Sequence, residues 1–265
     1  MAHTVPDILA RIVDRKRAEL AEVRAARGDL ERRAAGALDG RRDFARALTG
    51  AGAAVIAEVK KASPSKGVFS ADFRPAAIAA AYQAGGAAAL SVLTDRTYFQ
   101  GSLEDLAAAR GAVDVPVLRK DFTIDELHVV QAAAHNADAI LLIAAVLSET
   151  ELRRLRELAG EYKLAVLVEA HDLTELKIAL DSGATLVGVN NRNLHTFEVR
   201  LETSLELASA IPAGVVKVSE SGIRSRADIA RLRAAGYDAF LVGEYLMKSG
   251  NPTAALRDLT EGWEQ

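Results

Sequence analysis

The sequence predicts an α/β fold, a closed (β/α)8 barrel with an N-terminal helical extension. Eight short apolar stretches alternate with eight alanine- and leucine-rich helical stretches from Val55 onward, as in parallel strands joined by helices. The length of 265 residues suits one such barrel. The first fifty residues instead show helical spacing alone. We therefore expect a single domain over residues 1–265, with the extension over 1–50 and the barrel over 55–265.

The composition excludes several classes of protein. The chain has no cysteine, which removes disulfides, thiol nucleophiles and cysteine-bound zinc. Its formal net charge is −3 with no long run of one sign, so we expect no nucleic-acid or membrane partner. No apolar run reaches the length of a membrane span or a signal peptide. We expect a cytoplasmic enzyme that acts on a small molecule as a monomer, or at most a weak dimer.

The helical extension is predicted from apolar spacing. Ile8, Leu9, Ile12 and Val13 recur at helical intervals, and a second short helix is expected over 41–48. Large apolar side chains are few here, so we expect the extension to pack on the barrel rather than to fold as a separate domain.

The strands are predicted where short apolar runs are bounded by turn residues. In chain order they cover 55–60, 87–93, 115–120, 139–143, 165–169, 186–190, 215–219 and 239–242. Helices are expected over 75–84, 102–110, 125–135, 148–160, 172–182, 201–210, 225–235 and after Pro252. Glycines that follow helix ends are expected to be left-handed, namely Gly85, Gly160, Gly183 and Gly236.

A doubly wound open sheet is the alternative fold. Eight even units without an obvious reversal of strand order favour a closed barrel. No Gly-x-Gly-x-x-Gly pattern follows any predicted strand, which disfavours a dinucleotide-binding sheet.

The ends of the strands indicate a reactive pocket. In a parallel barrel all carboxyl ends meet at one mouth, where active sites form. Seven of the eight predicted ends carry polar residues or glycine, and the fourth is apolar. This mixture suits acid–base chemistry on an anionic, partly apolar substrate.

Glu58 and Lys60 stand at the end of the first strand. They are two residues apart and therefore point to the same side. Opposite charges at the end of a buried strand are costly unless they pair or take part in function. A purely structural ion pair is the alternative to a functional role.

Lys120 is the strongest candidate for an acid. Partial burial beside Lys60 is expected to lower its pKa, so that it donates a proton near neutral pH. A Schiff base is also chemically open to it. Glu58 and Glu169 are expected to divide the roles of base and charge stabiliser. For each residue, a structural salt bridge is the alternative.

The last two strands are followed by Ser221-Gly222 and Gly243-Glu244. In this fold those loops commonly bind phosphate through backbone N–H groups. The histidines show no His-x-x-x-His pair, so no metal site is expected.

Segments along nearly the whole chain resemble the indole-3-glycerol-phosphate synthase family, TIM-barrel enzymes of tryptophan biosynthesis. The most specific is IAEVKKASPSKG over 56–67. The others, in family order, are SVLTD (91–95), YFQGS (98–102), LRKDF (118–122), LVEAH (167–171), GVNNRNL (188–194), ESGI (220–223) and LVGE (241–244). The family also has a helical extension before its barrel.

The resemblance implies a carboxy-lyase reaction without a metal or organic cofactor. The substrate 1-(2-carboxyphenylamino)-1-deoxyribulose 5-phosphate closes to indole-3-glycerol phosphate, with loss of CO2 and water. Lys120 is implied as general acid and Glu169 as base or relay in the dehydration. Lys60 contacts the substrate carboxylate, and the lysine that acts in each step is left open. Glu58 and Asn190 orient the substrate and stabilise charge.

Binding roles are implied for further residues. Ser63 and Arg192 assist substrate binding. The anthranilate ring is expected against Phe99, Phe122, Leu141, Leu194 and Leu241. Phosphate is expected at Ser221, Gly222, Gly243 and the backbone of Glu244, with Lys60 nearby.

Two other functions are alternatives to the synthase reaction. The related phosphoribosylanthranilate isomerase would want a cysteine or an equivalent base on the first strand, and the chain has no cysteine. A catalytically silent sugar-phosphate-binding barrel would be expected to lack Lys120 or Glu169, and both are present.

Overall fold

A closed barrel of eight parallel strands forms the centre of the protein. The computed structural model describes residues 7–50, 52–64, 66–70 and 72–262. The barrel strands are β1 (Ala54–Val59), β4 (Ala89–Leu93), β5 (Val117–Lys120), β6 (Ala139–Ile143), β7 (Ala165–Ala170), β8 (Leu186–Asn190), β9 (Val216–Glu220) and β10 (Ala239–Val242). Their order around the barrel is β1-β10-β9-β8-β7-β6-β5-β4, with every pair parallel. The predicted (β/α)8 TIM barrel is confirmed, and the open sheet is excluded.

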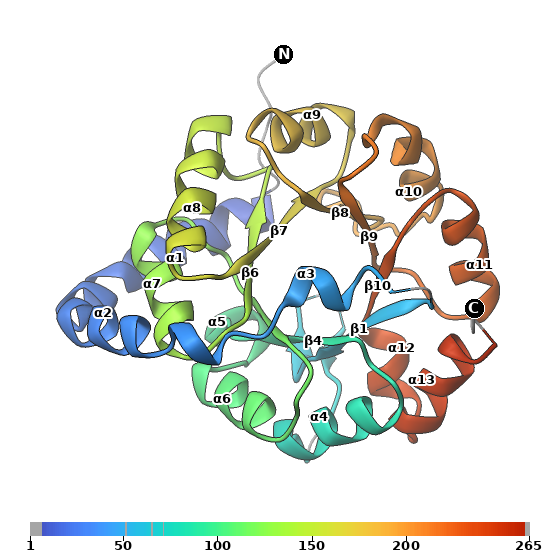
Figure 1. The fold of residues 1–265 in the computed structure, drawn as a ribbon, viewed down its shortest axis with the longest axis horizontal. Helices are drawn as coiled ribbons and strands as arrows, with labels where there is room; N and C mark the ends of the chain where they lie inside the picture. The colour runs from blue at the N-terminus through green and yellow to red at the C-terminus, as the bar shows by residue number, and fades with distance from the viewer. Residues whose placement is uncertain (1–6, 51, 65, 71, 263–265) are drawn as a thin grey trace.

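Helices surround the barrel on its outer face (Figure 1). They are α4 (Pro75–Ala84), α5 (Arg96–Phe99), α6 (Leu103–Gly111), α7 (Glu126–Ala134), α8 (Glu149–Glu161), α9 (Leu173–Asp181), α10 (Glu202–Leu207) with a 3-10 turn (Ala208–Ala210), α11 (Arg226–Ala234), α12 (Glu244–Lys248) and α13 (Pro252–Thr260). The short α5 and α12 were not predicted. Two strands begin two residues later than predicted, at Ala89 and Val117.

The left-handed glycines were predicted only in part. Gly183 and Gly236 have φ of 86° and 89°. After α4 the left-handed residue is Gly86 rather than Gly85, and Gly160 lies inside α8. Helix α4 ends at Ala84 as predicted, but Gly85 keeps a right-handed backbone as its C-cap, whereas α8 runs one residue beyond its predicted end.

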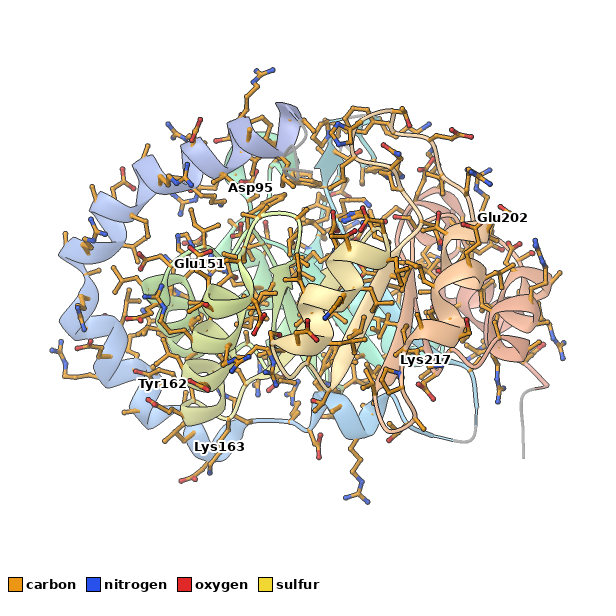
Figure 2. All side chains as sticks on the ribbon, turned by 90° about the horizontal axis from the view of Figure 1, so that it is seen from above. Asp95, Glu151, Tyr162, Lys163, Glu202 and Lys217 are labelled. Carbon is orange, nitrogen blue, oxygen red and sulfur yellow. The ribbon has the colours of Figure 1, made fainter. Side chains whose placement is uncertain are left out.

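The extension covers both ends of the barrel. It comprises α1 (Asp7–Ala25), α2 (Arg27–Gly36), a 3-10 turn (Leu38–Gly40) and α3 (Phe44–Ala47), of which α2 was not predicted. Figure 2 shows α1 above Asp95, which follows β4, whereas Lys217 of β9 lies toward the other end. Phe44 and Leu48, around α3, are fully buried among the side chains inside the barrel at that other end. The assignment of residues 1–265 to one domain stays a prediction, and 1–6 and 263–265 lie outside the described residues.

The inside of the barrel places the charged residues. Apolar side chains fill it, and successive side chains on one face of a strand are two residues apart. The same inward row therefore ends in a charged residue on four strands. The successive inward residues are Ile56 and Glu58, Leu118 and Lys120, Leu167 and Glu169, and Val218 and Glu220.

Two further elements complete the description. A small antiparallel ribbon of β2 (Ala62–Ser63) and β3 (Gly67–Val68) follows β1. Among the helices of the described ranges, none combines the length and apolar character needed to cross a membrane.

Candidate active site

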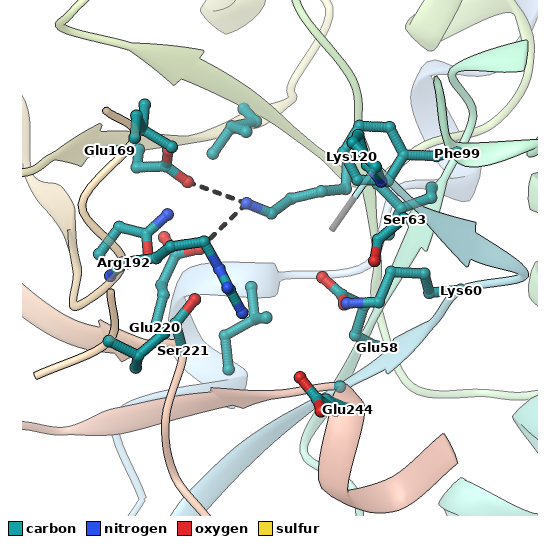
Figure 3. Close-up of a pocket in the computed structure, with 18 of the residues that line it drawn as sticks. Glu58, Lys60, Ser63, Phe99, Lys120, Glu169, Arg192, Glu220, Ser221 and Glu244 are labelled. Atoms are coloured by element: carbon teal, nitrogen blue, oxygen red, sulfur yellow. Dashed lines mark hydrogen bonds and ion pairs between the residues drawn. The ribbon is translucent and has the colours of Figure 1, made fainter. Parts of the chain in front are cut away.

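A cavity of about 200 Å³ opens at the carboxyl ends of the strands (Figure 3). All the site residues predicted from the sequence line it: Glu58, Lys60, Ser63, Phe99, Lys120, Phe122, Leu141, Glu169, Asn190, Arg192, Leu194, Ser221, Gly222, Leu241, Gly243 and Glu244. The structure thus brings together residues from all eight barrel strands or the loops that follow them.

Lys120 lies between two carboxylates. Its Nζ is 2.9 Å from Oε2 of Glu169 and 3.0 Å from Oε2 of Glu220 (Figure 3). Burial by itself lowers the pKa of Lys120, but attraction to Glu169, Glu220 and Glu58 outweighs it and raises the pKa above its usual value. The predicted lowering was therefore wrong, because carboxylates from β7, β9 and β1 converge on Lys120 inside the barrel and outweigh burial. The two carboxylates at hydrogen-bond distance therefore favour the ammonium form of Lys120.

Glu220 is a site residue that the sequence analysis missed. Its pKa is raised to about 7, because burial and the nearby Glu169 together outweigh the lowering effect of Lys120. In contrast, Lys120 outweighs burial at Glu169 and holds the pKa of that carboxyl below its usual value. Two carboxyl groups on one ammonium thus have pKa values pushed in opposite directions. The inward position of Val218, two residues earlier, was the signal that could have identified Glu220.

Glu58 and Lys60 form an ion pair on the opposite side of the cavity (Figure 3). The Nζ of Lys60 also lies 5.4 Å from the centre of the Phe69 ring, within the range of a cation–π contact. The predicted orientation of both side chains to the same side is confirmed, and the two charges pair. Both residues line the cavity, so the ion pair is open to a ligand.

Glycines on or just after adjacent strands, Gly188 on β8 and Gly243 after β10, make room for two of the carboxylates. A Cβ atom at Gly243 would overlap the carboxylate of Glu58, and one at Gly188 would overlap that of Glu220. Gly243 was predicted to bind phosphate, and the structure gives it this additional steric reason to be glycine.

The backbone of the aromatic wall is held by two aspartates that take part in buried ion pairs. The rings of Phe99 and Phe122 are 6.1 Å apart. Asp95 accepts a hydrogen bond from the backbone N–H of Phe99, and Asp121 accepts one from that of Phe122. Lys16 of α1 joins these carboxylates, with Nζ 3.0 Å from Asp95 and 2.8 Å from Asp121.

Helix α1 also contributes directly to the cavity. Ile8, Leu9 and Ile12 line it, together with the rings and aliphatic side chains of the barrel. The apolar spacing predicted a helix that packs on the barrel, but not that its side chains reach the site.

The loop after β9 has an unusual backbone. Ser221 and Gly222 have φ of 67° and 83°, which favours glycine at the second position. A Cβ at Gly222 would lie 2.6 Å from Val199. Glu244 pairs with Lys248 at 2.6 Å, so its carboxylate is held along α12.

Asn190 and Arg192 border the cavity at the end of β8. Oδ1 of Asn190 accepts a hydrogen bond from the backbone N–H of Arg192 at 3.0 Å. With the amide oxygen engaged, the NH2 group of Asn190 is the part that can donate to a ligand. Within the described parts of the chain, no three His, Asp or Glu side chains are grouped as metal ligands.

The sequence matches known proteins over almost its full length. Residues 9–259 match the family model described as indole-3-glycerol phosphate synthase. A protein of that name from Aromatoleum aromaticum is 52% identical over 258 residues, covering 96% of this chain and 98% of the relative. Another from Koribacter versatilis is 56% identical over 209 residues, covering 79% and 80%.

Solved structures share the fold at much lower identity. Thiamine phosphate pyrophosphorylase from Pyrococcus furiosus has a TM-score of 0.60 and 17% identity, covering 80% of this chain and 95% of that one. A mandelate oxidase variant has a TM-score of 0.56 and 20% identity, covering 78% and 70%. These likenesses show the barrel alone. The full-length match at about half identity shows more: the chain belongs to the indole-3-glycerol phosphate synthase family, which consists of decarboxylating lyases of tryptophan biosynthesis.

Proposed function

We propose that this chain closes the indole ring of indole-3-glycerol phosphate. The substrate is 1-(2-carboxyphenylamino)-1-deoxyribulose 5-phosphate, and the other products are CO2 and water. The observation that carries the proposal is the ammonium of Lys120, held by Glu169 and Glu220 beside an apolar wall. We further propose that the enzyme works in the cytoplasm without metal or organic cofactor, as a monomer or at most a weak dimer.

Lys120 is suited to the role of general acid. As the aromatic carbon attacks the ribulose carbonyl, negative charge develops on the carbonyl oxygen. An ammonium in a water-poor site stabilises that charge and transfers a proton to the oxygen. Loss of CO2 then restores the aromatic ring. The hydroxyl formed from the carbonyl leaves as water when it receives a second proton.

Glu169 is suited to the role of base. Lys120 keeps the carboxylate of Glu169 ionised despite burial. Glu169 can therefore accept a proton from the carbon that adjoins the hydroxyl-bearing carbon. Glu169 and the acid share a hydrogen bond of 2.9 Å, so a proton can pass between them. Glu58 and Asn190 would orient the sugar and stabilise charge, and Lys60 would contact the substrate carboxylate.

The remaining residues are proposed to bind the two ends of the substrate. Phe99, Phe122 and the apolar wall would hold the anthranilate ring close to the carbonyl. The backbone around Ser221, Gly222 and Gly243 would hold the phosphate, which supplies binding energy away from the reacting atoms. Ser63 and Arg192 would assist binding. The pairing of Glu244 with Lys248 supports a phosphate contact through the Glu244 backbone.

The proposal is tested by mixing the purified protein with this substrate in EDTA and recording indole fluorescence. A growing signal is expected, and it would establish metal-independent turnover. A catalytically silent sugar-phosphate-binding barrel is the second candidate. Binding of the substrate without any fluorescence change would favour that candidate and contradict the proposal.

The role of Lys120 is tested by Lys120→Ala, with Lys177→Ala on the exposed face of α9 as the matched control. Loss of a general acid lowers turnover by about 10²- to 10⁴-fold. We expect a loss of this size with an intact fold, because residues at the barrel mouth serve function more than stability. Near-normal turnover by Lys120→Ala would show that another group is the acid.

A further inference from the structure

Behind Glu169 lies an imidazole to which the proposed reaction gives no role. His171 follows β7, two residues after Glu169, and its side chain is 11% exposed. Its Nε2 is 3.3 Å from Oε1 of Glu169, and its Nδ1 is 2.8 Å from Oε2 of Glu175. The ring therefore joins two carboxylates, one in the cavity and one on α9.

Glu175 is held in place by the start of α9. It is buried, its own N–H donates to the capping carboxylate of Asp172, and its Oε2 also accepts from the backbone N–H of His171. A ring nitrogen beside each carboxylate favours a ring with two N–H groups, which is the imidazolium form. Burial lowers the pKa of His171, but Glu169 and Glu175 together raise it to about 10.

His171 and Glu175 add two charged groups to the row formed by Glu169, Lys120 and Glu220. Carboxylates and cations alternate through Glu175, His171, Glu169, Lys120 and Glu220, and every neighbouring pair is within 3.3 Å. His171 does not line the main cavity, so substrate bound there has no direct contact with it. It borders an adjoining cavity of about 150 Å³ behind Glu169.

We propose that His171 is a positioning residue that keeps Glu169 ionised and aimed at the reacting atoms. The imidazolium holds Oε1, so that Oε2 stays on Lys120. The contact between Nε2 and Oε1, at 3.3 Å, is an ion pair, since among the described residues Nε2 makes no hydrogen bond. This inference rests on the proposed role of Glu169 as base.

The groups that surround His171 come from four elements or loops. Glu169 lies on β7 and Glu175 on α9, and both face the ring. The adjoining cavity is also bordered by Asp172, Arg192 and His195. Any pH effect of His171 is therefore expected to depend first on the two carboxylates in contact with it.

The test compares His171→Leu with His171→Gln, and uses His135→Gln at the end of α7 as the matched control. Loss of the outer partner that orients a metal-binding side chain typically costs about 10- to 100-fold, and we use the same range for a partner that orients a base. We expect His171→Leu to lower kcat by about this factor with KM changed less than about threefold. Gln restores an N–H donor without the charge, so kcat should recover in part.

The pH profile separates this role from a structural one. Loss of the neighbouring cation raises the pKa of Glu169, so the acid limb of kcat should move to higher pH in His171→Leu and in His171→Gln. His135→Gln should leave it in place. If wild-type enzyme turns over substrate and His171→Leu matches the control in both kcat and acid limb, the inference is overturned and the proposed function stands.

A second readout needs no substrate. In ¹⁵N NMR, His171 should show two protonated ring nitrogens at pH 8, and Glu175→Gln should move its titration to lower pH. A neutral ring at pH 8 would overturn the inference. If wild-type protein gave no turnover, the proposed function would fail, and the NMR signal would decide the charge state of His171 independently.

Discussion

Gly188 leaves the space that the carboxylate of Glu220 occupies: a Cβ atom at Gly188 would overlap Oε1 of Glu220. Gly243 stands in the same relation to Glu58. Two of the three inward carboxylates at the mouth of the barrel, Glu58 and Glu220, thus occupy space left by a glycine on or just after a neighbouring strand.

Gly188→Ala tests this relation. The added methyl group must displace Glu220, which moves one of the two carboxylates away from Lys120. We expect kcat to fall at least 10-fold, with a loss of about 1–3 kcal/mol in unfolding free energy from overpacking. Steady-state kinetics and urea unfolding measure both effects. Gly160→Ala is the control, since it meets open space on α8 and should stabilise slightly; equal behaviour of the two variants would contradict the steric argument.

Glu220→Gln should change the pH dependence of stability. The pKa of Glu220 is about 7 in the folded protein, above an unfolded value near 4.3. Between about pH 4.3 and pH 7 the folded state keeps a proton that the unfolded state has released, so stability falls as pH rises through this window. Gln cannot ionise and lacks this fall.

We expect the melting temperature of Glu220→Gln, relative to that of wild type, to increase from pH 5 to pH 8. Differential scanning calorimetry at several pH values measures it, with Glu157→Gln on the outside of α8 as control. A constant difference between Glu220→Gln and wild type across this range would show that Glu220 does not titrate there.

Lys16→Met should weaken both the fold and the aromatic wall. Lys16 is buried against Asp95 and Asp121, and removal of one partner from buried ion pairs costs about 3–5 kcal/mol. Because the two aspartates fix the backbone of Phe99 and Phe122, KM should also rise. Guanidinium unfolding and kinetics are the measurements.

The control for Lys16→Met is Arg15→Met. Arg15 is exposed and pairs with Glu19, so its loss should cost less than about 1 kcal/mol. If the two variants lost equal stability, the buried position of Lys16 would have no energetic consequence.

Ser221→Glu should weaken substrate binding if the phosphate lies at the loop after β9. A carboxylate placed there repels a phosphate, so KM should rise at least 10-fold while kcat changes less. Ser221→Asn is the control, because Asn is neutral and accepts the left-handed backbone at φ 67°. An unchanged KM for Ser221→Glu would place the phosphate elsewhere.

The barrel could be predicted because its strands and helices alternate along the chain. Each strand is a short apolar run, and the side chains that point into the barrel are followed, two residues later, by site residues on the same face. The predicted residues therefore all line one cavity, although their individual roles stay predictions. By contrast, α2 was missed because Leu30 and Ala34 are its buried residues, which is too weak a pattern for a helix.

The electrostatics of the site could not be predicted from the sequence. Lys120 and Glu220 are 100 residues apart, and their contact depends on barrel closure. The sequence indicated that Lys120 is buried, but not that attraction to three carboxylates outweighs the effect of burial on its pKa. The contribution of α1 was missed for a similar reason, since its position over the mouth depends on the Lys16 ion pairs.

Phe44 and Leu48 fill the barrel at the end away from the cavity, so that end offers no path for a substrate or product. A molecule bound at the mouth has packed side chains beneath it, and α1 and the loops after the strands border the side on which the cavity opens. Substrate enters and products leave through the same opening of the cavity, so a bound product must dissociate before the next substrate binds. The glycerol phosphate product should therefore act as a competitive inhibitor.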